Sequence, residues 1–360
     1  MEAFADIMLL RTRIEIPTAP VAPRCAPCPV LLLIMGLLYA WPSHAAIRDR
    51  IIIVGSSTVY PFSALVAEHF AKSGPFSAPV VRATSTAEGF RVFCAGIGGD
   101  TPDISNASRP ISEAERAICA ENGVRKITGI RIGYDSLILA NAIGASNFNI
   151  TLAQLWRAAA GVVPINGHLV PNPYRSWHDI DSTLPDRPIK LIGPAPGHGT
   201  RDAFVELVLE PSCKAALAAL SAQSVERETV CENVRNDGRW TDVDNLELIL
   251  GKLASNHDAM GILTYSYMEQ FRNRIHAANI DGIVPSRVTI PSGSYPMSRP
   301  LLIYVKEAHL NTTTGLADYA AEFLSFCAAG AHGYLADEGL VPLPMPELLS
   351  QRAAVARLQR

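Results

Sequence analysis

Three short loops place hydroxyl residues and glycines directly ahead of predicted helices. They are Gly55-Ser56-Ser57-Thr58, Thr84-Ser85-Thr86-Ala87-Glu88-Gly89 and the stretch 193–200. The first backbone N–H groups of a helix are unpaired and carry a positive partial charge, which suits a bound anion. Each loop alone is more simply explained as an ordinary helix cap, because Ser and Thr are common capping residues. Three loops of this kind in one chain predict an anion-binding site.

The third loop ends in His198-Gly199-Thr200 and follows the predicted strand 189–192. Its glycines allow a close approach of the backbone to a ligand. The lysine of the GxxxxGK[ST] pattern is missing, so this loop is not a nucleotide-binding P-loop. We expect ligand contacts from Ser57, Thr58, Thr86, His198, Gly199 and Thr200, and Ser56, Ser85 and Glu88 are further candidates.

Arg109 is the basic residue that the sequence places nearest to such a site. It follows the predicted strand 103–106, within Ser108-Arg109-Pro110. Ligands of open α/β sheets bind beyond the carboxyl ends of the strands, and a guanidinium group pairs well with two oxygens of an oxyanion. We therefore expect Arg109 to supply the counter-charge, with an ordinary surface arginine as the equal alternative.

The catalytic motifs of common hydrolases are missing from the sequence. Neither GxSxG nor HExxH occurs, and Asp242 and Asp244 lie in a polar stretch typical of a solvated turn. His198 has no identifiable Ser or Asp partner, and beyond residue 45 no CxxC pattern or Cys/His cluster has metal-ligand spacing. We expect a protein that is not an enzyme and that uses no cofactor or metal.

Apolar periodicity predicts alternating strands and helices that would position these loops. Strand 50–55 precedes helix 61–72, and strand 79–82 precedes helix 89–95. Further strands are expected at 103–106, 127–131 and 136–140. Such alternation predicts a parallel sheet.

The alternation restarts near residue 151. The predicted elements are helix 152–159, a loop to Trp177, strand 189–192, helix 201–209, a returning strand at 298–306, and helices 315–329 and 331–338. We expect an α/β fold with one lobe formed by residues 46–140 and 298–360 and a second lobe formed by residues 141–297. A chain that crosses twice between lobes encloses a cleft, where small ligands bind.

Residues 1–45 read as a signal peptide. The apolar run 29–41 follows Arg11, Arg13 and Arg24 and precedes the small-residue stretch 43–46. This run is shorter than the roughly 20 residues that span a bilayer. An uncleaved anchor is the alternative. We expect export to the periplasm and a mature chain that begins near Ala46 or Ile47.

Length and charge restrict the function further. At 360 residues the chain exceeds what one hydrophobic core usually serves. Apolar residues make up 48% and charged residues 18%, and the formal net charge is -3. This balance contains no basic run that would attract nucleic acid. An anion must therefore be recognised locally.

Five of the seven cysteines lie beyond the predicted signal peptide. In an exported protein, their spacing favours the disulfides Cys94–Cys119 and Cys213–Cys231, each closing a loop of roughly 20 residues. Cys327 is left over, and we expect it to be buried.

At these loops the chain resembles the phosphate-binding substrate-binding proteins of phosphate ABC importers. The resemblance covers nearly all of the chain after residue 45 and lies closest to a branch with a Ser-Arg-Pro motif. It rests on GSSTVYPF at 55–62, GFRVFCAG at 89–96, ISNASRPIS at 104–112, W-x-D at 177–179, IKLIGP at 189–194, GT at 199–200, DAMGILTYSY at 258–267, SRPLLIYVK at 298–306 and GLVPLP at 339–344.

The resemblance implies a type II periplasmic-binding-protein fold and a phosphate held at helix N-termini. The ligands that the resemblance implies are Thr58, Thr86, Gly199 and Thr200. It also implies that Arg109 and the cysteine pair Cys94 and Cys119 are features of this branch. It also implies delivery to a membrane permease by a protein that we expect to be a monomer.

The third loop departs from the family pattern. Relatives carry a carboxylate and a serine where this chain has Gly197 and His198. The departure bears on which oxyanion is bound, and Glu88 is a candidate replacement for the carboxylate. The alternatives are a sensor or scaffold protein of the same fold with altered specificity and, third, an exported hydrolase.

Overall fold

A computed structural model describes residues 48–218 and 227–359 of the chain. The signal peptide predicted over residues 1–45 lies outside this part. Within the described residues, no helix is both long enough and apolar enough to cross a bilayer.

The loops that open helices follow strands of one half of the main sheet. This half runs in the order β2-β1-β3-β13-β4, and β1 pairs in parallel with both β2 and β3. The parallel pairing predicted from the alternation is therefore present here, but β13 lies antiparallel to both β3 and β4. The bounds are β1 (Ile52–Ser56), β2 (Val80–Thr84), β3 (Ile104–Ala107), β4 (Ile127–Ala142) and β13 (Ser298–Lys306).

β4 links the two halves of the sheet. Its residues 127–136 pair with β13, and residues 137–142 continue into an antiparallel pairing with β10 and β11. The second half then runs β4-β10-β8-β9 with parallel pairs between β10, β8 and β9. Its strands are β8 (Leu191–Pro194), β9 (Trp240–Val243), β10 (Met260–Thr264) and β11 (Ile275–Ala277). The sequence predicted two strands where the structure has one continuous strand.

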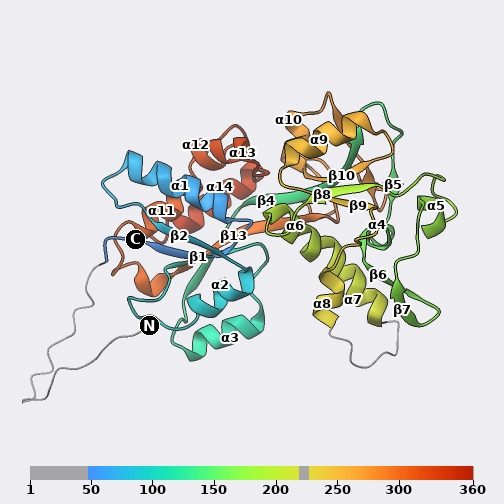
Figure 1. Cartoon of the computed structure of the whole chain (residues 1–360). Coiled ribbons are helices and arrows are strands. Elements are labelled where there is room, and N and C mark those ends of the chain that lie inside the picture. Colours follow the sequence, from blue (N-terminus) through green and yellow to red (C-terminus); the bar gives the residue numbers. More distant parts are fainter. Residues whose placement is uncertain (1–47, 219–226, 360) are drawn as a thin grey trace, which may run out of the picture. The chain divides into compact units, whose positions relative to one another are not determined.

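Helices pack on both faces of the first half (Figure 1). α1 (Tyr60–Ser73) and α11 (Leu316–Phe323) lie on one side, while α2 (Thr86–Phe93) and α3 (Glu113–Glu121) lie on the other. α2 begins with Ser85 as its cap, whose hydroxyl accepts from the Glu88 N–H at 3.1 Å. The predicted helices 61–72 and 89–95 correspond to α1 and α2.

α2 approaches the sheet so closely that only glycine fits at the contact. A Cβ atom on Gly89 would lie 2.5 Å from the Cα atom of Gly55, which is inside any normal contact distance. Gly55 itself has a φ of 125° and leaves β1 toward the first polar loop. The two glycines thus fix the distance between the first and second loops.

The remaining elements surround the second half and close the chain. Helix 152–159 is found as predicted, whereas the predicted loop up to Trp177 contains a hairpin, and predicted helix 315–329 is interrupted after Phe323. The elements are β5 (Asn149–Ile150), α4 (Leu152–Ala159), β6 (Val162–Ile165), β7 (His168–Pro171), α5 (Trp177–Ile180), α6 (Gly199–Phe204), a π-helix (Val205–Leu209), α7 (Glu210–Ala218), α8 (Arg227–Glu232), α9 (Leu246–Ser255), α10 (Tyr265–Gln270), β12 (Asn279–Ile280), a 3-10 helix (Glu307–His309), α12 (Phe326–Ala329), α13 (Tyr334–Asp337) and α14 (Met345–Val355).

Both predicted disulfides are present. Cys94–Cys119 joins the end of α2 to α3, and Cys213–Cys231 joins α7 to α8. Cys327 carries a free thiol and is exposed. The expectation that Cys327 is buried was therefore wrong, because it lies on the short helix α12, whose buried face is formed by Ala328 and Ala329.

Candidate functional site

The first loop leaves β1 and opens α1, and its hydroxyls are held from two directions. Ser57 donates its hydroxyl hydrogen to Asp202 of α6 at 3.1 Å. Thr58 accepts a hydrogen bond from Arg299 of β13 at 2.8 Å. Because the Thr58 oxygen is the acceptor of that bond, its own hydrogen is left to donate to a ligand.

The third loop lies against the first. A Cβ atom on Gly199 would stand 3.9 Å from the Thr58 Cα atom. His198 caps α6, and its Nδ1 accepts the Thr200 N–H at 3.1 Å. This capping bond places the ring proton on Nε2, which can donate to an anion.

Residues of these two loops line one cavity. It has a volume of about 390 Å³, and we call it the loop cavity. The structure brings five of the predicted ligand residues together in its wall, namely Ser57, Thr58, His198, Gly199 and Thr200.

The second loop lines a neighbouring cavity of about 440 Å³ that shares Ser57 with the first. Predicted residues Ser56, Ser85 and Thr86 lie here with the carboxylates of Asp202, Glu206, Glu210 and Glu232. We call it the acidic cavity. Thr86 is buried, and its hydroxyl lies 3.0 Å from that of Ser108 and also accepts the Ser108 N–H at 3.2 Å.

Glu88 lines neither of these cavities. It makes two hydrogen bonds of 2.6 Å with the guanidinium of Arg91, one turn further along α2. The hydrogen bonds from Arg91 hold the pKa of Glu88 below its usual range. This exposed pair gives no support to Glu88 as a replacement for the missing carboxylate of the third loop.

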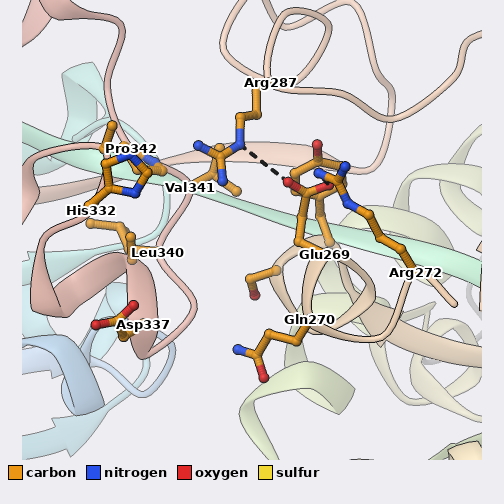
Figure 2. Close-up of a pocket in the computed structure, with 13 residues that line it drawn as sticks. Glu269, Gln270, Arg272, Arg287, His332, Asp337, Leu340, Val341 and Pro342 are labelled. Atoms are coloured by element: carbon orange, nitrogen blue, oxygen red, sulfur yellow. Dashed lines mark hydrogen bonds and ion pairs between the residues drawn. The ribbon is translucent and has the colours of Figure 1, made fainter.

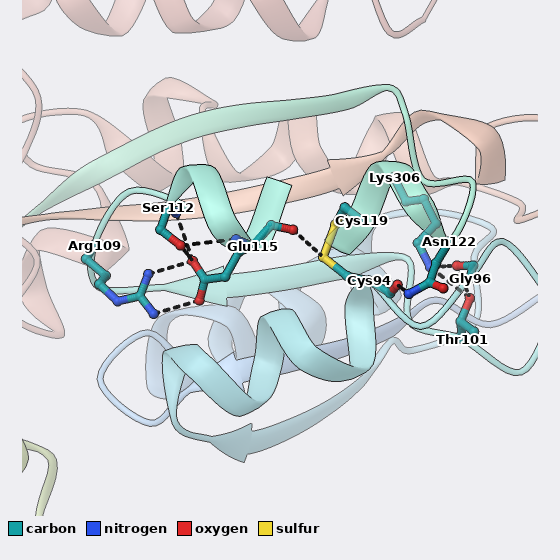
Figure 3. The surroundings of a disulfide bond; sticks show 9 residues. All are labelled: Cys94, Gly96, Thr101, Arg109, Ser112, Glu115, Cys119, Asn122 and Lys306. Atoms are coloured by element: carbon teal, nitrogen blue, oxygen red, sulfur yellow. Dashed lines mark hydrogen bonds and ion pairs between the residues drawn. A yellow bond between two sulfur atoms is a disulfide. The ribbon is translucent and has the colours of Figure 1, made fainter. Parts of the chain in front are cut away.

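Arg109 also lies outside the walls of both cavities. Its guanidinium binds both carboxylate oxygens of Glu115, at 2.9 and 2.8 Å (Figure 3). Glu115 belongs to the capping box that begins α3 and also accepts the Ser112 N–H. The hydrogen bond to Glu115 is the main cause that raises the pKa of Arg109. The charge of Arg109 is thus already matched by a neighbouring carboxylate.

Arg299 is the charged residue that the sequence reasoning missed. It lies on β13 with only 5% of its side chain exposed, and it contacts Thr58, Asp135 and Glu206. Asp135 and Thr58 line the loop cavity, while Glu206 lines the acidic cavity. Arg299 therefore stands between the two. The usable signal was an arginine at the head of the segment SRPLLIYVK, directly before the apolar run 300–305.

Ser108 and Glu206 extend the same network. The Ser108 hydroxyl lies 3.4 Å from a carboxylate oxygen of Glu206, which is also the oxygen that meets Arg299. These contacts join the loop after β3 to the π-helix after α6. They connect Thr58 of the first loop and Thr86 of the second loop through one buried guanidinium.

A third cavity of about 290 Å³ adjoins the loop cavity and shares Ser266 and Gln270 with it. Figure 2 shows Arg272 and Arg287 on either side of Glu269, whose carboxylate pairs with both. The opposite wall is formed by the segment that contains α13 and residues 340–342. We call it the side cavity.

Comparison with known families and proteins gives consistent matches. A family model described as the PBP superfamily domain matches residues 41–330. Protein SphX of Synechocystis sp. is 26% identical over 325 residues, covering 88% of this chain and 84% of the relative. The phosphate-binding protein PstS of Staphylococcus saprophyticus is 26% identical over 305 residues, covering 83% of this chain and 82% of the relative.

Solved structures share the fold. A possible phosphate binding protein from Planctomyces limnophilus superposes with a TM-score of 0.67 and 24% identity, covering 88% of this chain and all of that one. An ABC-type phosphate transport receptor from Vibrio cholerae gives a TM-score of 0.57 and 18% identity, covering 82% of this chain and all of that one. The predicted type II periplasmic-binding-protein fold is confirmed.

Proposed function

The chain belongs to the PBP superfamily domain family, and from that membership we propose that it is an exported binding protein that captures a phosphate group for an ABC importer. One observation carries the proposal. The Arg299 guanidinium donates to the Thr58 hydroxyl at 2.8 Å, which leaves the hydrogen of that hydroxyl to donate. The third loop lies close by, since a Cβ atom on Gly199 would stand 3.9 Å from the Thr58 Cα atom. Hydroxyl and backbone donors next to a buried positive charge suit a tetrahedral oxyanion.

The proposed ligand groups come from all three loops. Ser57, Thr58, His198, Gly199 and Thr200 act from the loop cavity, and Thr86 acts from the adjoining one together with Ser108. Arg299 is the buried cation behind them, and its guanidinium also meets the carboxylates of Asp135 and Glu206. Arg109 stays a prediction as a ligand, since its guanidinium is occupied by Glu115.

Phosphate is favoured among oxyanions by the relatives, several of which are named as phosphate-binding proteins. The remaining parts of the proposal follow from the sequence. Residues 1–45 are removed on export to the periplasm, residues 46–140 and 298–360 form one lobe and residues 141–297 the other. The loaded monomer then delivers its ligand to a membrane permease.

Isothermal titration of the chain from residue 46 onward tests this function. Phosphate is expected to bind at one site per chain. Arsenate should bind with slightly lower affinity, and sulfate and molybdate should bind more weakly still. A matched titration of the Thr58→Val variant, which keeps the side-chain shape and removes the hydroxyl, should show a loss of phosphate affinity. Absence of binding for every oxyanion in the wild-type chain would refute the proposal.

A further inference from the structure

The loop cavity extends beyond the loops that form its anion-binding end. Ser57 of the first loop bonds Asp202 of α6, and Gly199 of the third loop approaches Thr58. Arg299 contacts Thr58 of this end and Glu206 of the acidic cavity. Residues of both loops line the loop cavity, so its volume of about 390 Å³ extends from these loops to the wall around α10.

This volume is too large for orthophosphate alone. A water molecule takes about 30 Å³ of liquid, so the loop cavity corresponds to roughly a dozen waters. Orthophosphate is a small ligand with only five heavy atoms. Cavities of roughly 300–1,000 Å³ are typical of sites that bind larger, organic ligands. The space beyond the anion-binding loops is thus sufficient for a substituent on the phosphate.

The wall beyond the loops offers hydrogen bonds rather than positive charge. Its polar groups are Thr264, Ser266, Tyr267, Gln270 and Glu338, and its apolar part is Pro61, Phe62 and Leu246. None of the residues that line the loop cavity is a lysine or an arginine. A second anionic group would find no counter-charge there, while hydroxyl or ammonium groups would find acceptors.

Two residues of α10 mark the place of the substituent. The hydroxyl of Tyr267 is buried and has no hydrogen-bond partner in the described part of the chain. Buried polar groups are normally paired, so this hydroxyl suits a ligand group. Gln270 is exposed and lies where the loop cavity meets the side cavity, so its amide can bond a ligand tail that leaves toward the side cavity.

We propose that the ligand is a phosphate monoester or phosphonate with a short tail that carries hydroxyl or ammonium groups. Its phosphate group occupies the three loops, and its tail lies along α10 against Tyr267 and Gln270. This inference rests on the proposed function and names the substrate class of the same site.

Titration calorimetry with orthophosphate, glycerol 3-phosphate, phosphoethanolamine and methyl phosphate tests the inference. The first two esters should bind about tenfold more tightly than orthophosphate, the gain expected from one or two added hydrogen bonds. Methyl phosphate has no hydrogen-bonding tail and should match orthophosphate. Comparing the glycerol and ethanolamine esters distinguishes a hydroxyl tail from an ammonium tail.

Variants of α10 make the result specific to the tail. Tyr267→Phe and Gln270→Ala should each lower the affinity for the preferred ester several-fold and leave orthophosphate affinity unchanged. Gln359→Ala, which lies outside the cavity, is the matched control. Orthophosphate binding as tightly as or more tightly than all esters would overturn the inference and leave the proposed function intact. Binding of none of these compounds would overturn both.

Discussion

Arg299 provides the buried positive charge of the site, with one hydroxyl and two carboxylates around it. Arg299→Lys keeps the charge but loses the planar, multiply donating guanidinium. We expect phosphate affinity to fall by about tenfold or more, because losing the hydrogen-bond donors of the guanidinium near the anion costs about 1.4 kcal/mol or more of binding free energy. Calorimetry measures the change directly.

Arg109→Ala is the comparison for that variant. Its guanidinium is bound by Glu115, so we expect a smaller loss of phosphate affinity than in Arg299→Lys. A larger loss in Arg109→Ala would restore Arg109 as the anion ligand predicted from the sequence.

His198 closes the first turn of α6 through its ring nitrogen. His198→Ala removes this cap, and loss of an N-cap side chain costs about 1 kcal/mol of unfolding free energy. His198→Ser restores a capping oxygen, so we expect a stability close to that of wild type and retained phosphate binding. Urea unfolding of the two variants tests the contrast, and equal stability of the alanine and serine variants would contradict it.

Lys306 is fully buried, and its ammonium donates to the carbonyl of Gly96 at 2.6 Å and to Thr101 at 2.8 Å (Figure 3). Burial lowers the pKa of Lys306 from 10.5 to about 8. Between these values the unfolded chain binds more protons than the folded one, so this group makes stability rise with pH, by about 1.4 kcal/mol per unit at most. Below pH 8 Lys306 is charged in both the folded and the unfolded chain, so it no longer makes the free energy of unfolding depend on pH.

Urea unfolding of wild type and Lys306→Met at pH 8 and pH 9.5 isolates this effect. The variant cannot titrate at this position, so the wild type should gain stability relative to it as pH rises. A constant difference between the two proteins would show that the pKa of Lys306 is not lowered in the folded state.

At the scale of elements, the contact between α2 and β1 depends on the absence of a side chain at Gly89. Gly89→Ala forces the helix away from Gly55, and overpacking of this kind costs about 1–3 kcal/mol. Gly99→Ala is the matched control, because a Cβ there meets no atom within 4 Å. We expect a lower melting temperature for Gly89→Ala only. Since Gly89 also sets the position of the second loop, its phosphate affinity should fall as well.

The sequence was informative for much of the local structure. Strand, loop and helix follow one another as predicted around the first and third loops, because apolar periodicity and capping residues act within a few positions. The hairpin β6–β7 was missed although Asn166-Gly167 is a strong turn signal, and both residues have positive φ. β4 was divided over residues 132–135, around Gly133, where a Cβ atom would lie 2.6 Å from the Cγ atom of Leu340.

The charges of the site could not be predicted in the same way. Arg299 reaches Thr58 across 241 residues of sequence and Glu206 across 93, and no local pattern encodes those distances. Arg109 was preferred because it stands close in sequence to a strand end. Its partner Glu115, six residues away, begins the next helix and neutralises it.

For the whole molecule, processing and oxidation are measurable together. Mass spectrometry of periplasmic protein should show an N-terminus near residue 46 and a mass lower by four hydrogens, from Cys94–Cys119 and Cys213–Cys231. Thiol labelling of the unfolded, unreduced chain should modify Cys327 alone. A retained Met1 or labelling of five cysteines would contradict the predicted processing or the disulfides.

The position of β13 also affects the order in which the chain is assembled. Residues 302–305 pair with residues 104–107, so the first half of the sheet lacks a central strand until nearly the whole chain has been synthesised. The second half draws β8, β9 and β10 from one continuous stretch and needs only the end of β4. Pairings so distant in sequence form slowly, so we expect the first half of the sheet to be completed last. A chain that completes its ligand site last remains unable to hold phosphate until its carboxyl-terminal segment has arrived.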